Sequence, residues 1–384
     1  MQSILATKRS RLAALAAPSQ AAARSRPEIA VADVAAWTVR SSAAAEPRLV
    51  LALRTSAGLT GYGETTAEPD PPTAAARALR EVNELVGTDA LSTEAARRTL
   101  ASAPTPIRGA VDMALLDVKG KVASAPVYDL LAGRTRDKAR AMAAVSGTTE
   151  EELTRAISAA RQAGYRAFSV PVLFPGDSPT RGRKFYADTA EMLERLRQAG
   201  ADDLALDCGG ATTAAEGAGL AARLERFHLM WLDEPARDIN DEALKKISHE
   251  TVTPVGWGRR FTENSRFQDL LRLQVIDVLR PDVGLNGISS VRRAAALGEA
   301  YYTAVAPFHR GGPIGAAAAL QIAASVPNFV VQEVAFSMDD RERRMHEEIA
   351  GGSALNVVDG FFELPTGPGL GVEVDEGALS RYSI

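Results

Sequence analysis

Acidic, basic and histidine side chains stand directly after several β-rich segments of this sequence, and such groups move protons or hold charge in active sites. When parallel strands form a barrel, residues just beyond their carboxyl ends converge on one mouth. The candidates at these positions are Asp207, Asp233, Glu234, Arg259, Asp282, His309 and Glu333. Each of them alone could equally cap a helix or lie in a solvated loop. As a set they predict a site with carboxylate, guanidinium and imidazole groups at one barrel mouth.

Eight short β-rich runs are the elements that would position these residues. They follow one another at about 25 residues with a helical pattern between them, the length of one βα unit, and eight such units describe a TIM barrel. The runs are residues 142–145, 167–170, 204–206, 229–232, 253–255, 275–279, 302–305 and 329–331. An open doubly wound sheet is the alternative, but no glycine-rich dinucleotide motif follows any of the runs.

The segment before the barrel pattern predicts a second domain. Residues 29–34 and 49–54 alternate as strands do. Residues 73–85, 93–103 and 107–131 follow a helical period. Strands followed by helices make an α+β module.

The expected fold is α/β: a modified TIM (β/α) barrel with an α+β N-terminal capping domain, completed by a turn-dense C-terminal tail. The expected division is residues 1–27 as an N-terminal extension, 28–138 as the capping domain, 139–338 as the barrel and 339–384 as a segment returning to the cap.

Composition argues against several classes of partner. The chain has 384 residues and a formal net charge of −4, with its basic residues spread out, so neither nucleic acid nor a membrane is an expected partner. The single cysteine, Cys208, leaves no intramolecular disulfide and favours a cytoplasmic location. Residues 1–27 are basic and rich in Ala and Ser, but their apolar run is shorter than a secretory core, so we favour an extension over a targeting signal.

Several short motifs, in order along the chain, carry a family resemblance. They are Gly-Tyr-Gly-Glu at 61–64, Ala-Leu-Leu-Asp-Val-Lys-Gly at 114–120, Leu-Asp-Cys-Gly-Gly at 206–210, Trp-Leu-Asp-Glu-Pro at 231–235 and Leu-Arg-Pro-Asp-Val at 279–283, followed by Gly-Pro at 312–313, Asn-Phe at 328–329, Asp-Gly at 359–360 and Pro-Thr-Gly-Pro-Gly-Leu-Gly at 365–371. The chain thereby resembles the enolase superfamily, in its mandelate racemase / muconate lactonizing enzyme-like branch of acid-sugar dehydratases, with degenerate active-site motifs.

The resemblance implies a lyase or isomerase: a dehydratase or epimerase of small carboxylates that works by α-proton abstraction. It implies Mg²⁺ held by three acids after strands three, four and five, which stabilises the charge that develops on the substrate carboxylate. It also implies a homo-oligomer.

Carried over position by position, the resemblance is partial. Asp207 and Glu234 match the first two metal ligands, Asp282 the aspartate of a His-Asp pair, and Glu333 the strand-eight acid. Ser169 and Pro171 occupy the positions of the usual lysine bases and cannot replace them near neutral pH. Arg259 occupies the third metal-ligand position. Phe308 stands where the histidine is expected, and His309 follows one residue later.

Two hypotheses describe the cation at this site. Asp207 and Glu234 would repel each other without one, and Arg259, permanently charged and forked, could bridge them in place of Mg²⁺. Alternatively, Arg259 turns outward and Asp233 completes a displaced magnesium site.

His309 likewise has two interpretations. It is a shifted catalytic base polarised by Asp282, or its side chain points away from the mouth while Phe308 seals the pocket. Whether the chain is an enzyme therefore stays open. It could act as a dehydratase or epimerase with His309, Asp282 and Glu333 as catalytic groups, or as an inactive or metal-independent homologue that binds a carboxylate.

Overall fold

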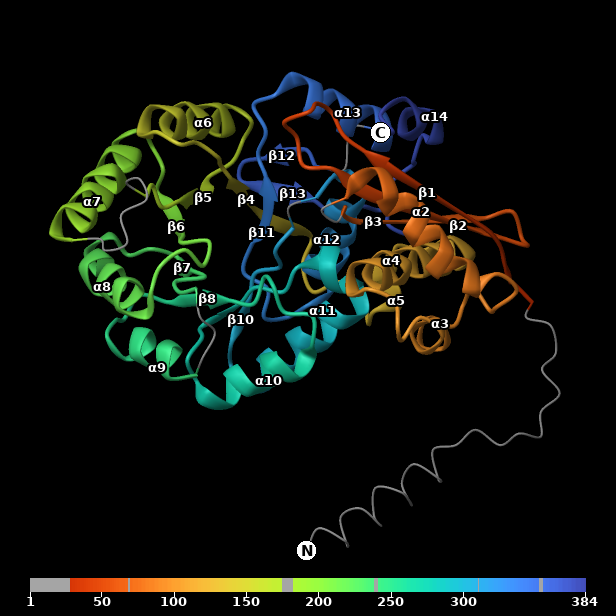
Figure 1. Cartoon of the computed structure of the whole chain (residues 1–384), viewed down its shortest axis with the longest axis horizontal. Coiled ribbons are helices and arrows are strands. Elements are labelled where there is room, and N and C mark those ends of the chain that lie inside the picture. Colours follow the sequence, from red (N-terminus) through yellow and green to blue (C-terminus); the bar gives the residue numbers. More distant parts are fainter. Residues whose placement is uncertain (1–27, 68–69, 175–181, 238–240, 310, 352–354) are drawn as a thin grey trace, which may run out of the picture.

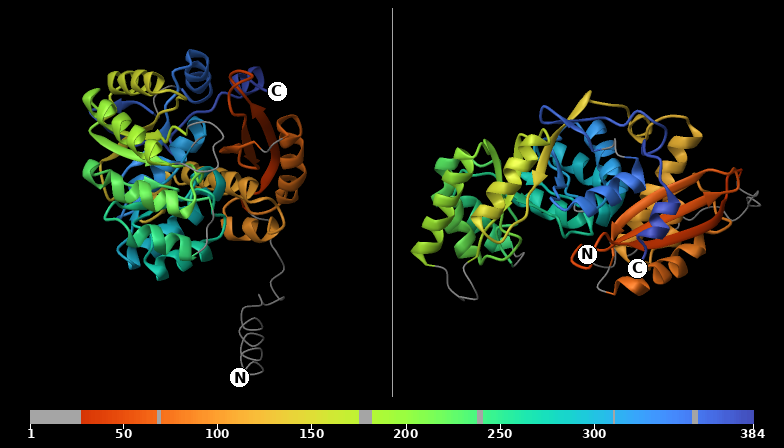
Figure 2. Two further views of the ribbon diagram at one scale, coloured as in Figure 1. Left: turned by 60° about the vertical axis from the view of Figure 1, so that its left-hand side comes forward. Right: turned by 90° about the horizontal axis from the view of Figure 1, so that it is seen from above.

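The structure is a computed structural model that describes residues 28–67, 70–174, 182–237, 241–309, 311–351 and 355–384. Figure 1 shows two parts: a ring of strands surrounded by helices, in yellow, green and light blue, and a smaller sheet with helices, in red and orange. We call the larger part the barrel and the smaller part the cap. The two further views in Figure 2 also place the cap beside the barrel. The predicted fold, a TIM-like barrel with an α+β cap, is confirmed.

The central strand of the cap sheet is buried on both faces. Its antiparallel strands, in spatial order, are β1 (Val31–Val39), β2 (Arg48–Thr55) and β3 (Thr60–Thr66). Successive side chains of a strand point to opposite faces. On β2, Leu49, Leu51 and Leu53 pack into the cluster of the cap helices. Val50 and Ala52 pack into the cluster that extends through the barrel. The sheet therefore joins the two parts of the molecule.

The cap helices cover one face of this sheet. They are α2 (Pro71–Val82), η1 (Asn83–Leu85), α3 (Thr93–Thr99), α4 (Thr105–Val122) and α5 (Val127–Leu130). Helix α4 crosses β3 so closely that a Cβ on Gly63 would lie 1.8 Å from the Ala110 carbonyl oxygen. The predicted single helix 107–131 is wrong: it breaks into α4 and α5, because Pro126 lacks a backbone N–H and disfavours a helical residue before it.

Eight strands form the barrel, as the spacing predicted. They are β4 (Lys138–Ala144), β5 (Ala167–Pro171), β6 (Asp203–Asp207), β7 (Leu232–Asp233), β8 (Val255–Trp257), β9 (Val278–Leu279), β10 (Ala304–Val305) and β11 (Gln332–Ala335). Neighbours from β4 to β10 pair in parallel, and β11 pairs in parallel with β4. The ring closes where the Val330 backbone N–H donates to the Val305 carbonyl at 2.9 Å.

The last barrel strand lies three residues later than predicted. Regular pairing with β4 begins only at Gln332, opposite Ala141. Residues 329–331 instead follow a turn, in which the Phe329 N–H points to the Val326 carbonyl, and then contact β10. As a result, Glu333 lies inside a strand and not after it.

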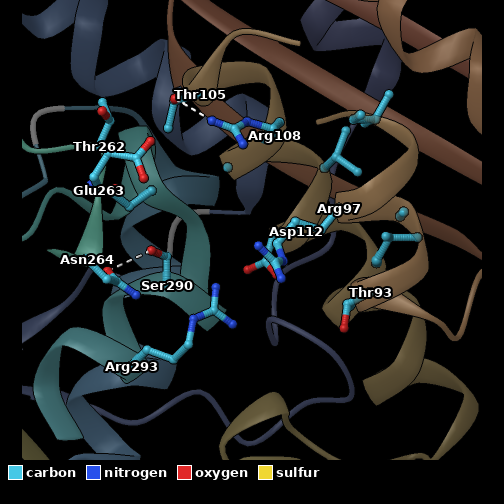
Figure 3. Close-up of a pocket in the computed structure, with 16 residues that line it drawn as sticks. Thr93, Arg97, Thr105, Arg108, Asp112, Thr262, Glu263, Asn264, Ser290 and Arg293 are labelled. Carbon is cyan, nitrogen blue, oxygen red and sulfur yellow. Dashed lines mark hydrogen bonds between the residues drawn. The ribbon is translucent and has the colours of Figure 1, made fainter. Parts of the chain in front are cut away.

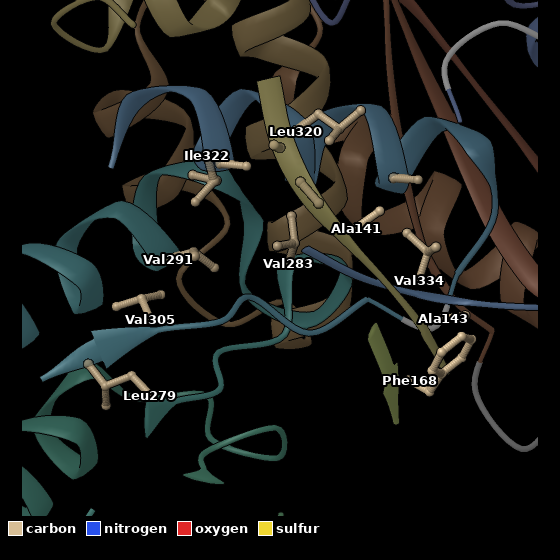
Figure 4. Packing of buried hydrophobic residues seen from close by; sticks show 14 of the residues in the cluster. Ala141, Ala143, Phe168, Leu279, Val283, Val291, Val305, Leu320, Ile322 and Val334 are labelled. Atoms are coloured by element: carbon tan, nitrogen blue, oxygen red, sulfur yellow. The ribbon is translucent and has the colours of Figure 1, made fainter. Parts of the chain in front are cut away.

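Helices surround the barrel. They are α6 (Glu150–Gln162), α7 (Arg183–Gln198), α8 (Ala214–Leu224), η2 (Glu225–Phe227), α9 (Asp241–His249), α10 (Asn264–Leu273), α11 (Val283–Ala300) and α12 (Pro313–Ser325). Figure 4 shows Leu320 and Ile322 of α12 and Val283 and Val291 of α11 packed beside the barrel strands. All residues of α12 are buried, which explains its continuously apolar sequence. None of the described helices is long and apolar enough to cross a membrane.

Helix α11 is broken at Gly287, whose φ of 74° and ψ of 172° are not helical. The break frees backbone N–H groups at the start of the second half. One of them, on Ser289, donates to Asp112 Oδ2 of α4 at 2.8 Å. Asp112, which belongs to the smaller domain, thus serves as the N-terminal capping residue for the second half of α11.

The barrel interior below the strand ends is apolar. The side chains that fill it come from the strands or from residues next to them: Met142, Ala167, Ala205, Trp231, Val278, Ala306 and Val331. This layer excludes water from beneath the charged residues described below.

The C-terminal segment contacts both parts. It contains α13 (Asp340–Ala350), β12 (Val357–Val358), β13 (Phe361–Glu363) and α14 (Glu376–Arg381). Strands β12 and β13 form a hairpin whose turn residues, Asp359 and Gly360, have φ of 48° and 83°, as a type I′ turn requires. Strand β13 pairs with barrel strand β4, a contact that the sequence did not predict. Residues 382–384 then pair with the end of β1, as expected for a tail that completes the cap.

Candidate active site

Five charged side chains form an alternating chain across the carboxyl ends of the barrel strands. Asp207 ends β6, Asp233 ends β7, Arg259 and Arg280 follow β8 and β9, and Glu333 lies in β11. In order of contact they run Asp207, Arg259, Asp233, Arg280 and Glu333. Each arginine therefore has an acid on both sides. This geometry brings together four of the residues singled out from the sequence and adds one, Arg280.

Arg259 forms the outer half of this chain. Its Nη1 and Nη2 atoms donate to both carboxylate oxygens of Asp207, at 2.9 and 2.5 Å. Its Nε atom lies 3.4 Å from Asp233 Oδ2. A forked guanidinium matches a carboxylate in this two-bond geometry. The hypothesis of an inward arginine thus agrees with the structure, but its expected partners need correction: the side chain links Asp207 to Asp233, not to Glu234.

Two glycines let the end of strand β8 take this path. A Cβ on Gly256 would lie 2.8 Å from Asp233 Oδ1, and one on Gly258 would lie 2.4 Å from the Phe267 ring. Gly258 also has a φ of 124°, which side chains rarely allow. The Gly-Trp-Gly sequence before Arg259 is therefore needed to place the guanidinium among the acids.

Glu234 is held by backbone groups. Its Oε1 atom accepts hydrogen bonds from the N–H groups of Gly258, at 2.8 Å, and Arg259, at 3.0 Å. The residue is buried and has a φ of 46°, a strained conformation for a side chain of this kind. Burial, together with the charge of Asp233, raises the pKa of Glu234 above its ordinary value.

Arg280 forms the inner half of the chain and is completely buried. Its Nε donates to Asp233 Oδ1 at 3.1 Å, and its Nη2 donates to Glu333 Oε2 at 2.5 Å. Its Nη1 donates to the Ala306 carbonyl oxygen at 2.7 Å. In the sequence, Arg280 directly follows the predicted strand 275–279, and this position alone did not predict its role.

Phe308 covers both guanidinium groups. Its ring centroid lies 4.8 Å from Arg259 Cζ and 5.6 Å from Arg280 Cζ. The Trp231 ring lies 4.9 Å from Arg280 Cζ on the barrel floor. Contacts between a ring face and a guanidinium stabilise the cation in a dry environment. The phenylalanine in the expected histidine position is therefore part of the charged chain's packing.

His309 makes no hydrogen bond with these charged residues in the described part of the structure. Its Nε2 atom lies 3.0 Å from the Gly312 carbonyl oxygen, and the ring is 2% exposed. Its Nδ1 atom has no hydrogen-bond partner among the described residues. Asp282 instead caps helix α11, accepting from the Leu285 N–H at 3.2 Å. Both flank Gly284, but no hydrogen bond joins them in the described part of the chain. His309 also lines the cavity at the barrel mouth, so its catalytic role stays a prediction.

The acids of the chain differ in their proton affinity. Burial works to raise the pKa of Asp207, but the charge and hydrogen bonds of Arg259 outweigh it, so this pKa lies below its ordinary value. Burial raises the pKa of Glu333 in spite of the nearby charge of Arg280. Burial also raises the pKa of Asp282. Asp207, beside Arg259, thus stays ionised more readily than Glu333.

A cavity of about 760 Å³ lies over the outer end of the chain. Asp207, Arg259 and Phe308 line it from the barrel, and Glu46 and Arg48 line it from the cap. Ser169 and Pro171 of β5 also face it, where the resemblance places the lysine bases. The cavity has the size of a small-molecule site.

Comparison with known proteins gives the family. Residues 22–132 match the mandelate racemase / muconate lactonizing enzyme N-terminal domain, and residues 152–378 match the enolase C-terminal domain-like family. A D-galactonate dehydratase family member from Streptomyces bingchenggensis is 31% identical over 303 residues, which cover 71% of this chain and 72% of that protein. This chain therefore belongs to the mandelate racemase / muconate lactonizing enzyme family of the enolase superfamily.

Two further relatives extend the comparison. The D-xylonate dehydratase of Haloferax volcanii is 27% identical over 289 residues, covering 71% of this chain and 68% of that protein. The crystal structure of a mandelate racemase/muconate lactonizing enzyme from a Sulfitobacter species covers 92% of this chain and 96% of its own, with a TM-score of 0.82 and 23% identity. The last similarity shows the shared fold.

Members of this family generally depend on Mg²⁺, and the residues of this chain do not fit that ion. Mg²⁺ requires about six oxygen ligands in octahedral geometry. Here both oxygens of Asp207 accept from Arg259, and Glu234 Oε1 accepts two backbone N–H groups. The described residues contain no group of three or more acids, histidines or cysteines arranged to hold a metal.

Proposed function

We propose that this protein binds a small hydroxylated carboxylate at the barrel mouth, and that Arg259 supplies the positive charge that a divalent metal supplies in its relatives. The observation that carries the proposal is the two-bond contact between Arg259 and Asp207 at the third ligand position. A permanently charged guanidinium satisfies both oxygens of this carboxylate and repels a second cation. In this proposal, Mg²⁺-assisted α-proton abstraction is not the activity of the chain.

The ligand class is supported by the relatives and by the cavity. The two relatives described above are named for D-galactonate and D-xylonate, which are hydroxylated carboxylates. The cavity over the strand ends, at about 760 Å³, is large enough for such an acid. Arg155 of α6 is exposed and lines the same cavity, so it offers a charge for an incoming carboxylate.

The residues at the positions of the usual bases also support binding over turnover. Proton abstraction requires a base within hydrogen-bond reach of the substrate carbon. Ser169 and Pro171 cannot act as bases near neutral pH. His309 directs Nε2 to a backbone carbonyl, and its other ring nitrogen is buried.

Calorimetry tests this proposal. D-galactonate and D-xylonate would be titrated into the protein with and without a chelator, and Mg²⁺ would be titrated separately. We expect one acid to bind equally in both conditions and Mg²⁺ to give no heat of binding. Micromolar Mg²⁺ binding that disappears in Asp207→Ala would overturn the proposal. The Arg259→Glu variant, which restores an acid at the third position, provides the positive control because it should gain Mg²⁺ affinity.

An acid-sugar dehydratase is the second candidate. The relatives' names favour it, as do Asp207 and Glu234, which match the first two metal ligands. It predicts turnover of a sugar acid that stops when a chelator is added, whereas the binding proposal predicts no product with or without Mg²⁺.

The proposal also includes the oligomeric state and the cellular location of the protein. The family resemblance supports a homo-oligomer, which light scattering after size-exclusion chromatography would detect. The single cysteine supports a cytoplasmic location. Cell fractionation with a tagged chain would test this.

A further inference from the structure

A second cavity, of about 200 Å³, lies between the cap and the barrel. It shares no lining residue with the cavity over the strand ends. Figure 3 shows Arg97, Arg108 and Asp112 reaching it from the cap helices α3 and α4, opposite Ser290 and Arg293 of barrel helix α11. We call this cavity the interdomain pocket.

Three arginines and two acids line the interdomain pocket: Arg97, Arg108, Arg293, Asp112 and Glu263. Arg97 and Arg293 share a single acid, Glu94, at 2.9 and 3.3 Å. Asp112 caps the second half of α11, so its carboxylate is already engaged. Arg108 has no acidic partner among the described residues.

Arg108 has unused hydrogen-bond donors at the pocket. One Nη atom donates to Thr105 Oγ1 at 2.8 Å, as Figure 3 shows. Its Nε atom is buried and has no partner within the described part of the chain. Its Nη1 atom makes no hydrogen bond within the described part of the chain and is not among the fully buried atoms, so it can donate to a ligand in the pocket.

Uncharged polar groups surround the arginine. Thr93 and Thr105 line the pocket from the cap, and Thr262, Asn264 and Ser290 line it from the barrel. Ser290 Oγ and Asn264 Oδ1 lie 3.2 Å apart and so help to fix each other's orientation. An arginine without an ion-pair partner in the described part of the chain, beside hydroxyl and amide groups, is complementary to a molecule with one negative charge and several hydroxyls.

We infer that the interdomain pocket binds a small hydroxylated carboxylate, whose carboxylate accepts from Arg108 and whose hydroxyls bond to the surrounding threonine, serine and asparagine side chains. A cavity of roughly 150 Å³ holds a six-carbon ring, so this pocket suits an acid of about four carbons. The ligand class is argued from the pocket itself, and the site is separate from the barrel mouth.

The pocket adjoins the barrel mouth through one loop. Residues 258–263 connect β8 to α10, and Arg259 near the start of this loop contacts Asp207. Thr262 and Glu263 at its end line the interdomain pocket. The Phe261 carbonyl between them accepts from Asn286 Nδ2 at 2.9 Å. A ligand that joins α4 to this loop therefore stabilises the contact between cap and barrel.

Calorimetry with D-threonate, a four-carbon hydroxylated acid, tests the inference. We expect Arg108→Gln to weaken binding of D-threonate at least tenfold and Arg108→Lys to weaken it less. The matched control is Arg98→Gln, an exposed arginine of α3 outside the pocket lining, which should bind as the unchanged protein does. D-threitol, which lacks the carboxylate, should not bind. Circular dichroism would establish that each variant is folded.

A crystal soaked in D-threonate would show whether the ligand lies against Arg108. A folded protein without D-threonate at Arg108 would overturn the inference, as would equal binding of D-threitol or stronger binding of inorganic phosphate. D-galactonate binding at the mouth is measured separately, because it should be unchanged in Arg108→Gln. Failure of the proposed function would thus leave the Arg108-dependent signal intact, and failure at Arg108 would leave the mouth signal intact.

Discussion

The guanidinium of Arg259 contacts both carboxylate oxygens of Asp207 and also lies 3.4 Å from Asp233, so one side chain neutralises acids from two neighbouring strands. Arg280 repeats this arrangement one step deeper, between Asp233 and Glu333. The strand ends are therefore held together by side-chain charges of the chain itself. This arrangement leads to predictions about stability that do not depend on knowing the ligand.

Arg259→Ala should lower the free energy of unfolding by about 3–5 kcal/mol, because it leaves the largely buried Asp207 without its partner and removes one of the two cations beside Asp233. Adding Asp207→Asn should recover part of that loss, since the second change removes one of the unpaired charges. Urea denaturation of the two single variants and the double variant measures the coupling. Arg260→Ala, at the exposed neighbour, is the control. A loss below about 0.5 kcal/mol in Arg259→Ala would mean that the pair is energetically unimportant.

The pH dependence of stability should report on Asp207. Its pKa is lowered in the folded protein, so the stability that it contributes is present above the unfolded pKa, about 3.9, and is lost as the pH falls through the folded pKa. The difference in unfolding free energy between the unchanged protein and Asp207→Asn should therefore be largest above about pH 4 and shrink in more acidic solution. A difference that is constant from about pH 2 to 6 would contradict this assignment.

Arg280→Met should also destabilise the protein, by about 3–5 kcal/mol, because Glu333 then lies buried without a cation. The double variant Arg280→Met with Glu333→Leu should be closer to the unchanged protein, since an apolar pair needs no compensation in this dry interior. Thermal unfolding followed by circular dichroism compares the two. If the double variant is less stable than Arg280→Met alone, Arg280 and Glu333 stabilise the folded protein by more than the neutralisation of each other's charge.

Glu64 should couple the cap to the barrel. This buried residue of β3 accepts hydrogen bonds from the N–H groups of Gly312, Ile314 and Gly315 at the start of α12. We expect Glu64→Ala to lower the unfolding free energy by about 2–3 kcal/mol, because the N–H groups lose a charged acceptor. Glu64→Gln should have an intermediate effect and Glu84→Ala, at an exposed site, almost none. Equal stability of all three variants would refute this role.

Much of the fold could be predicted from the sequence because its signals are local. The eight barrel strands are short apolar runs at regular spacing, and the turn at Asp359 and Gly360 has the residues that a hairpin turn requires. The break between α4 and α5 was missed because the apolar pattern continues through it and only Pro126 marks it. The shift of β11 by three residues was missed because residues 329–331 are as apolar as a strand.

The site was less predictable because side-chain direction depends on contacts between distant strands. The exchange to Arg259 was visible in the sequence, but its partner Asp233 was not, since the choice between adjacent Asp233 and Glu234 is set by the backbone turn at β7. Arg280 was missed because its acids come from β7 and β11, more than forty residues away on either side. Neither contact is indicated by residues that lie close together in the sequence.

The pairing of β1 with residues 382–384 has a consequence for how the chain is made. The Arg40 N–H donates to the Tyr382 carbonyl at 3.1 Å, and the Ile384 N–H donates to the Thr38 carbonyl at 2.9 Å. The whole barrel lies between these partners in the sequence. During synthesis, residues 38–40 therefore stay without these partners until the barrel has been made, so this corner of the cap is completed last.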